Sequence, residues 1–181
     1  MPVDRTVEVR DLGIGKLKAD VATLQRQRVT VGYQGPSGAA QHPNAGASIA
    51  QVAAWQEFGT PGSDDRKYDQ ARGHIPSRPF VRTGLAKYSN EIAEAIKNAF
   101  RRVLGGDASP EQAQAEVGER MVEAVQQTIL DARTWAKPLA DATIERKGHD
   151  DPLIESGAVY DATSYAVRDG DKIVRTGGGA K

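Results

Sequence analysis

Two periodicities alternate along the N-terminal part of the chain. Residues 6–10 alternate polar and β-branched side chains, which predicts a half-buried first strand. Between residues 14 and 24 the apolar side chains recur three or four positions apart, with charged side chains between them, a spacing typical of a short amphipathic helix. Residues 29–33 return to the strand pattern, so we expect the two strands to be neighbours in one sheet.

The middle of the chain has the pattern of a helical hairpin. Apolar residues spaced mostly by four predict a long helix from about residue 80 to 104, and the Gly-Gly pair at 105–106 ends it. Ser109, Pro110 and Gln112 have the spacing of an N-cap, a first helical residue and a capping box. The apolar stripe that follows predicts a second long helix, antiparallel to the first.

Shorter elements flank this hairpin in the sequence. Residues 48–58 are predicted to form a helix. Pro138 opens another short helix, which ends by Gly148. Residues 163–167 and 172–175 have strand patterns and flank a turn that contains Asp-Gly, which predicts a C-terminal β-hairpin.

Two stretches rich in glycine, proline or charged residues, at about 34–46 and 61–73, are predicted to be flexible loops. A short tail is predicted at 176–181. Together the patterns predict a single α+β domain over residues 1–181. Its small antiparallel or mixed sheet uses strands from both ends of the chain and packs against the helical hairpin and the shorter helices.

The segment from Trp55 to Arg82 combines aromatic residues with prolines. Pro76 and Pro79 fix their own φ near about −65° and push the residue before each of them towards an extended conformation. We therefore expect a stiff ribbon with alternating exposure, whose shape suits contact with another protein surface.

Composition limits the function classes that need to be considered. Basic and acidic residues number 24 each, so no net charge attracts nucleic acid or an anionic membrane. The chain has no cysteine, which excludes disulfides, thiolate catalysis and the common zinc-finger ligand sets. No apolar run is long enough to span a bilayer, and the N-terminus has no signal-peptide pattern. We expect a protein made in a cytoplasm, without a membrane partner.

Three short patterns have a catalytic interpretation, and each has a simpler one. Residues 13–16 resemble part of a phosphate loop, but Leu17 stands where the Mg²⁺-binding hydroxyl belongs. Residues 145–147 echo a nuclease motif but fall in a helical pattern. His149 with Asp150 and Asp151 could hold a metal ion or form a solvated turn. We predict no enzyme activity, and hence no catalytic residue, cofactor, bound metal or small-molecule substrate.

Four segments follow one another in an order that carries a family resemblance. They are Glu-Phe-Gly-Thr at 57–60, Ile-Pro-Ser-Arg-Pro-Phe-Val-Arg at 75–82, a Trp, Pro-Leu, Thr and Lys spacing at 135–147, and Pro-Leu-Ile-Glu-Ser-Gly at 152–157. The chain resembles the neck and tail-completion proteins of tailed bacteriophages, the HK97 gp10-like family. The resemblance covers roughly the middle and C-terminal two-thirds of the sequence.

This resemblance implies a structural protein of the virion neck or tail, made in the host bacterial cytoplasm. Members of the family assemble as rings between the capsid portal and the tail tube, so a hexamer, or alternatively a dodecamer, is expected here. The implied partners are further copies of the chain and the neighbouring neck and tail-tube proteins. Genomic DNA would pass through the lumen, with non-specific contact at most.

Charge is distributed unevenly, although its sum is zero. Residues 64–87 carry an excess of basic side chains, and residues 107–123 carry an excess of acidic ones. Separated surfaces of opposite charge can join the front of one copy to the back of the next. We therefore predict that the contacts between subunits involve Trp55, Glu57, Phe58, Arg78, Phe80, Arg82, Glu111, Glu116 and Glu119.

The alternative function is a small cytoplasmic DNA-binding or DNA-processing protein that uses the basic residues between positions 66 and 87. Zero net charge, few aromatic residues and the lack of a recognisable DNA-binding motif argue against it. A gel-shift titration at low salt distinguishes the two functions, because a protein that contacts phosphates binds strongly there and weakens steeply as salt rises.

Overall fold

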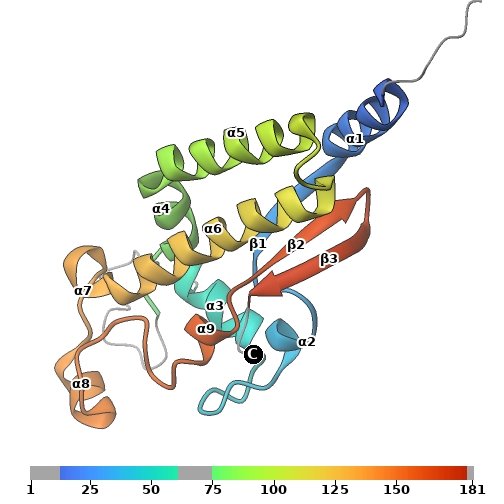
Figure 1. The fold of residues 1–181 in the computed structure, drawn as a ribbon. Coiled ribbons are helices and arrows are strands. Elements are labelled where there is room, and N and C mark those ends of the chain that lie inside the picture. Colours follow the sequence, from blue (N-terminus) through green and yellow to red (C-terminus); the bar gives the residue numbers. More distant parts are fainter. Residues whose placement is uncertain (1–12, 61–74, 179–181) are drawn as a thin grey trace, which may run out of the picture.

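The computed structural model describes residues 13–60 and 75–178 (Figure 1). The helices in this part of the chain are α1 (Ile14–Arg26), α2 (Gly35–Ala39), α3 (Ile49–Phe58), α4 (Phe80–Lys87), α5 (Ser89–Gly105), α6 (Pro110–Leu130), α7 (Ala132–Trp135), α8 (Asp141–Lys147) and α9 (Ala158–Asp161). The strands are β1 (Gln27–Gly32), β2 (Ser164–Asp169) and β3 (Lys172–Gly178).

The strands form one antiparallel sheet in the order β1-β2-β3 (Figure 1). Val29 lies opposite Val167, and Val31 lies opposite Tyr165. The pairing of β2 with β3 shifts register between Val167 and Arg168, which is the position of a bulge. β1 comes from the N-terminal part of the chain and the β2–β3 hairpin from its C-terminal part. The predicted α+β class, with strands from both ends of the sequence, is therefore confirmed.

α5 and α6 form the predicted antiparallel hairpin, and α6 lies along the sheet (Figure 1). Gly106 ends α5 in the left-handed conformation, with φ 81°. The Ser109 side chain accepts a hydrogen bond from the Gln112 backbone N–H (3.2 Å), and the Gln112 side chain accepts one from the Ser109 N–H (2.9 Å). The capping box with Pro110 at the first helical position is confirmed.

The single helix predicted from residue 80 to 104 is wrong, because the chain breaks at Tyr88 into α4 and α5. Gly84 explains how α4 meets α6. A side chain at this position would lie 2.9 Å from the Ala124 carbonyl oxygen and 2.9 Å from the Thr128 hydroxyl, so only glycine permits this close approach of α4 to α6. The turn at Tyr88 then lets α5 run along α6 as well.

The buried core lies around α6. Phe80 and Ile129 belong to an apolar cluster that joins α3, α4, α6 and the segment leading into β2. A second cluster joins α6 to the sheet around Tyr165, whose ring fits between two glycines. A Cβ atom on Gly118 of α6 would lie 2.4 Å from the ring, and one on Gly177 of β3 would lie 2.5 Å from it. Small residues on both sides thus let the large ring fill the space between α6 and the sheet.

The loop predicted at 34–46 is more ordered than expected. It contains α2 and then runs back on itself. The Ile49 N–H donates to the Ala40 carbonyl oxygen (2.9 Å), and the His42 N–H donates to the Ala47 carbonyl oxygen (2.8 Å). These local backbone bonds supply the order that the glycine and proline content did not predict.

Two predictions at the C-terminal side are also corrected. The helix predicted to open at Pro138 begins instead at Asp141, because the carbonyl groups of Lys137 and Pro138 accept hydrogen bonds from Arg78 and hold the chain outside the helix. The predicted tail begins later than residue 176, since β3 continues to Gly178. The predicted hairpin itself is confirmed.

The strand predicted at 6–10 and the loop predicted at 61–73 lie outside the described residues. Within the described part of the chain, no helix combines the length and the apolar character that a bilayer crossing needs.

Candidate interaction surface

The ribbon after α3 folds back onto the end of that helix. Gly59 ends α3 with a φ of 76°, a conformation that favours glycine. The Thr60 N–H donates to the Ile75 carbonyl oxygen (3.0 Å), and the Arg78 N–H donates to the Gln56 carbonyl oxygen (2.6 Å). The two ends of the Trp55–Arg82 segment are therefore fixed side by side.

Glu57 connects α3 to the start of α4. Its side chain is only 7% exposed. One carboxylate oxygen accepts from the Val81 N–H (2.9 Å), and the other accepts from the Arg82 guanidinium (2.9 Å) and the Arg82 N–H (3.4 Å). A carboxylate that bonds the free N–H groups at a helix start stabilises that end of the helix.

Arg78 is buried, at 4% exposed, between the ribbon and the segment before α8. Its Nε donates to the Lys137 carbonyl oxygen (2.9 Å), one Nη donates to the Pro138 carbonyl oxygen (3.3 Å), and the other donates to the Gln56 amide oxygen (3.3 Å). All three acceptors are neutral, and no carboxylate among the described residues pairs with this guanidinium. Burial lowers the pKa of Arg78, as expected for a cation removed from water without a counter-charge.

Aromatic residues of the ribbon divide between core and surface. Phe80 is fully buried and meets the Tyr33 ring edge to face, with ring centroids 6.2 Å apart. Trp55 is 38% exposed and Phe58 is 68% exposed. The Arg82 guanidinium lies 5.4 Å from the centre of the Phe58 ring, within cation–π range. We call Trp55, Phe58 and Arg82 the α3 patch.

Burial corrects part of the predicted subunit interface. Glu57, Arg78 and Phe80 are buried within their own chain, where each already has internal contacts. A sequence pattern of charged and aromatic residues does not distinguish these from surface contacts. Among the predicted residues of the ribbon, only those of the α3 patch are exposed at the outer surface.

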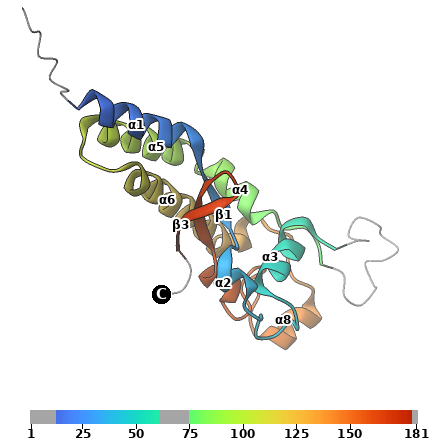
Figure 2. The ribbon, with the colours of Figure 1, turned by 90° about the vertical axis from the view of Figure 1, so that its right-hand side faces the viewer.

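The predicted acidic residues lie on the N-terminal half of α6. Glu111, Glu116 and Glu119 are exposed. Glu116 forms an ion pair with Arg102 of α5, whereas Glu111 and Glu119 form none with any described residue. α6 begins at the α1 side of the molecule, while α3 lies towards the other end (Figures 1 and 2). The structure thus places the acidic residues and the α3 patch far apart on one subunit.

A second exposed apolar surface lies at the same end as the acidic residues. It belongs to α1 and α5, which pack side by side (Figure 2). We call it the α1–α5 patch, and its residues are Ile14, Leu17, Ile96, Phe100 and Leu104. Periodicity placed Ile14, Leu17, Ile96 and Phe100 on the apolar stripes of helices, but a stripe that packs in the core and one that binds a partner have the same spacing. No buried residue occurs in α1. This helix packs on α5 and α6, and its outer face is exposed.

A cavity of about 710 Å³ lies beside the α3 patch, between the ribbon, α8 and the segment before α9. Its wall includes the basic residues Arg78, Lys137, Arg146 and Lys147. The only carboxylate that lines it among the described residues is that of Glu155, which lies 3.3 Å from Arg146. The cavity is therefore basic, a property that sequence analysis did not predict because its basic residues come from separate segments.

Lys147 is held at the wall of this cavity by a backbone contact. Its ammonium group donates to the Asp151 carbonyl oxygen (2.8 Å). Burial lowers the pKa of Lys147. The carboxylates of Glu155 and Asp151 oppose that shift, and the positive charges of Arg78 and Arg146 add to it.

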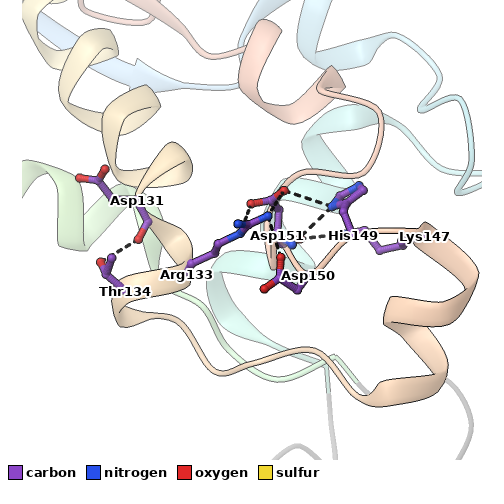
Figure 3. Close-up of polar contacts among 7 residues, drawn as sticks. All are labelled: Asp131, Arg133, Thr134, Lys147, His149, Asp150 and Asp151. Carbon is purple, nitrogen blue, oxygen red and sulfur yellow. Dashed lines mark hydrogen bonds and ion pairs between the residues drawn. The ribbon is translucent and has the colours of Figure 1, made fainter.

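Ion pairs hold the turn that follows α8 (Figure 3). Arg133 of α7 contacts Asp150 (2.6 Å) and Asp151 (2.6 Å), and the His149 ring nitrogen lies 3.2 Å from Asp151. Within the described residues, no group of three or more His, Cys, Asp or Glu side chains could hold a metal ion. The two aspartates instead tie α7 to the turn, which fixes the position of Lys147 beside the cavity.

Comparison of the chain with protein-family models, with curated proteins and with solved structures gave no match.

Proposed function

We propose that this protein is a structural subunit that assembles head to tail into a ring at the head–tail junction of a tailed bacteriophage. The motif order supports the phage role, and one structural observation supports the ring. The α3 patch and the α1–α5 patch both expose apolar side chains, and the helices that carry them lie towards opposite ends of the molecule (Figure 2). Two unlike surfaces on one chain favour a heterologous contact, which closes into a ring if the rotation per subunit permits.

Charge is consistent with the same arrangement. The α3 patch includes Arg82 and lies beside the basic cavity. Glu111 and Glu119 lie at the end that carries the α1–α5 patch and have no ion-pair partner among the described residues. When the front of one copy meets the back of the next, apolar side chains are buried and opposite charges approach each other.

Cross-linking tests the ring, and the lack of native cysteine makes the result unambiguous. Ala54 on α3 and Ala19 on α1 are exposed and leave both apolar patches intact when changed. Protein carrying Ala54→Cys and Ala19→Cys is treated with a short bis-maleimide at high concentration. We expect a ladder of covalent oligomers that ends at the ring. The matched control pairs Ala54→Cys with Ala86→Cys, an exposed position on α4.

The outcomes of this experiment separate the alternatives. A head-to-tail ring gives a ladder with the test pair only, and either Phe58→Asp or Phe100→Asp shortens it. A dimer from Ala54→Cys alone, as abundant as the products of the pair, would indicate a two-fold contact and contradict the ring. Equal ladders from test and control pairs, or no ladder at all, would also contradict it.

The place in the virion needs its own measurement. Negative-stain images of the protein mixed with purified tail tubes are expected to show rings at the ends of the tubes. Rings that never associate with tube ends would contradict a neck position while leaving ring formation intact.

A further inference from the structure

The basic side chains that line the cavity beside the α3 patch outnumber the carboxylates that could neutralise them, among the described residues. Among the described residues, the hydrogen-bond acceptors of Arg78 and Lys147 are all neutral oxygens. Arg146 has one carboxylate contact, to Glu155 at 3.3 Å. Four basic side chains and one carboxylate line the wall in the described residues, so the cavity has an excess of positive charge.

One of these positive charges, that of Arg78, is buried. A buried guanidinium normally has an anionic partner, because a charge removed from water without one is destabilising. Arg78 is 4% exposed and uses three of its donor N–H groups on the acceptors given above. A guanidinium has five such groups, so two remain that could bond an anionic ligand entering the cavity.

The apolar part of the wall restricts the ligand further. Trp55, Leu139, Leu153 and Val159 line the same cavity. A free phosphate would not pack on Trp55, which is exposed, or on Leu139, which is half-buried. The phosphate backbone of duplex DNA runs over a protein surface and would not reach Arg78 inside the wall. A ligand that offers both carboxylates and apolar side chains satisfies both parts of the cavity.

We propose that this cavity binds an acidic, partly apolar peptide segment of a partner protein. One carboxylate meets the Arg78 and Lys147 groups, and neighbouring apolar side chains pack on Trp55 and Leu139. The size of the cavity, about 710 Å³, falls in the range of ligand sites in proteins. The proposal concerns a contact with another protein and does not require ring formation.

Peptide binding to the full chain tests the proposal. The probes are labelled octapeptides that alternate Glu or Asp with Leu, Val or Phe, and the control probes are the same peptides with Gln or Asn. Inorganic phosphate and an oligo-dT strand serve as competitors. Binding is followed by anisotropy of the label and by the fluorescence of Trp55, which lines the cavity. Trp135 is partly buried elsewhere, so Trp135→Phe isolates the Trp55 signal.

The variants are chosen so that folding does not obscure the result. Arg78→Gln removes internal hydrogen bonds and is expected to destabilise the fold, so Lys147→Gln and Arg146→Gln carry the test. Lys172→Gln, on the exposed strand β3, is the matched control for loss of one positive charge. Loss of a charge-assisted hydrogen bond is expected to weaken binding about tenfold or more, and thermal unfolding checks that each variant is folded.

The proposal is supported if acidic octapeptides bind, amide controls do not, and Lys147→Gln weakens binding while Lys172→Gln leaves it unchanged. It is overturned if no octapeptide binds, or if Lys147→Gln and Lys172→Gln change binding equally. It is also overturned if oligo-dT or phosphate binds more tightly than every peptide in a manner that depends on Lys147, because the ligand would then be a phosphate. Ring assembly is measured separately, by cross-linking.

Discussion

Substitution of Phe80 by alanine tests whether the ribbon is part of the core of its own subunit. The side chain is fully buried against residues of α3 and α6 and meets the Tyr33 ring. Truncation of a buried Phe costs about 3–5 kcal/mol through lost burial and the cavity that remains. The aromatic pair accounts for about 0.5–1.5 kcal/mol of that loss. A domain of this kind has about 5–15 kcal/mol in total, so the expected loss is a large fraction of the stability.

Thermal unfolding and urea unfolding are both followed by tryptophan fluorescence, at a protein concentration low enough that assembly does not contribute. For a chain of this length, about 2–4 °C of melting temperature corresponds to 1 kcal/mol. The melting temperature should therefore fall by about 6–20 °C. A second, independent estimate of the free energy of unfolding comes from the urea midpoint and the slope of the transition.

Phe58→Ala is the matched control, because it removes the same ring from the same ribbon at a position that is 68% exposed. Its loss should not exceed about 1 kcal/mol, which is the scale of the exposed cation–π contact with Arg82. If Phe80→Ala and Phe58→Ala destabilised the isolated subunit equally, the division of the ribbon into buried and exposed parts would be refuted. If Phe80→Ala cost less than about 1 kcal/mol, its placement in the core would be refuted.

Three further predictions concern a cap, a close packing contact and a pH dependence. Ser109→Ala removes the capping box of α6 and should lower the free energy of unfolding by about 1 kcal/mol in urea titrations; an unchanged midpoint would contradict a role for the cap. Gly118→Ala places a methyl group 2.4 Å from the Tyr165 ring. The overpacking penalty of about 1–3 kcal/mol or more should outweigh the helix-propensity gain of about 1 kcal/mol, so the variant should be less stable. A stabilised variant would contradict this packing. Burial lowers the pKa of Lys147, and only the protonated amine pairs with a carboxylate. Octapeptide binding should therefore weaken as pH rises through that lowered pKa, below the ordinary lysine value of about 10.4. Lys147→Arg should remove this weakening, and an identical pH profile in the variant would contradict the role of Lys147.

Local signals were the reliable part of the sequence. Ser109 with Gln112, the Gly106 helix end and the Asp169–Gly170 turn are confirmed because each depends on backbone geometry and hydrogen bonds within a few residues. The predictions that failed are those in which a residue distant in the sequence determines the local backbone conformation. Arg78 holds the carbonyls of the segment before α8, and this contact cannot be predicted from residues 135–147 alone.

The break at Tyr88 is a second failure of this kind. Apolar residues keep a helical spacing through the break, so the period predicts one continuous helix. The break is explained by the tertiary structure. Gly84 of α4 lies against the backbone of α6, and both α4 and α5 pack on that helix.

By itself, the sequence determined the α+β class, the helical hairpin and the terminal β-hairpin, because periodicity, caps and turns are local properties. Only the tertiary structure decided which aromatic and charged residues of the ribbon are exposed. It buried Glu57, Arg78 and Phe80 and left Trp55 and Phe58 at the surface. It also brought Arg78 to the same cavity as Lys147. Exposure and proximity depend on what packs against a residue from elsewhere in the chain, and a linear pattern does not contain that information.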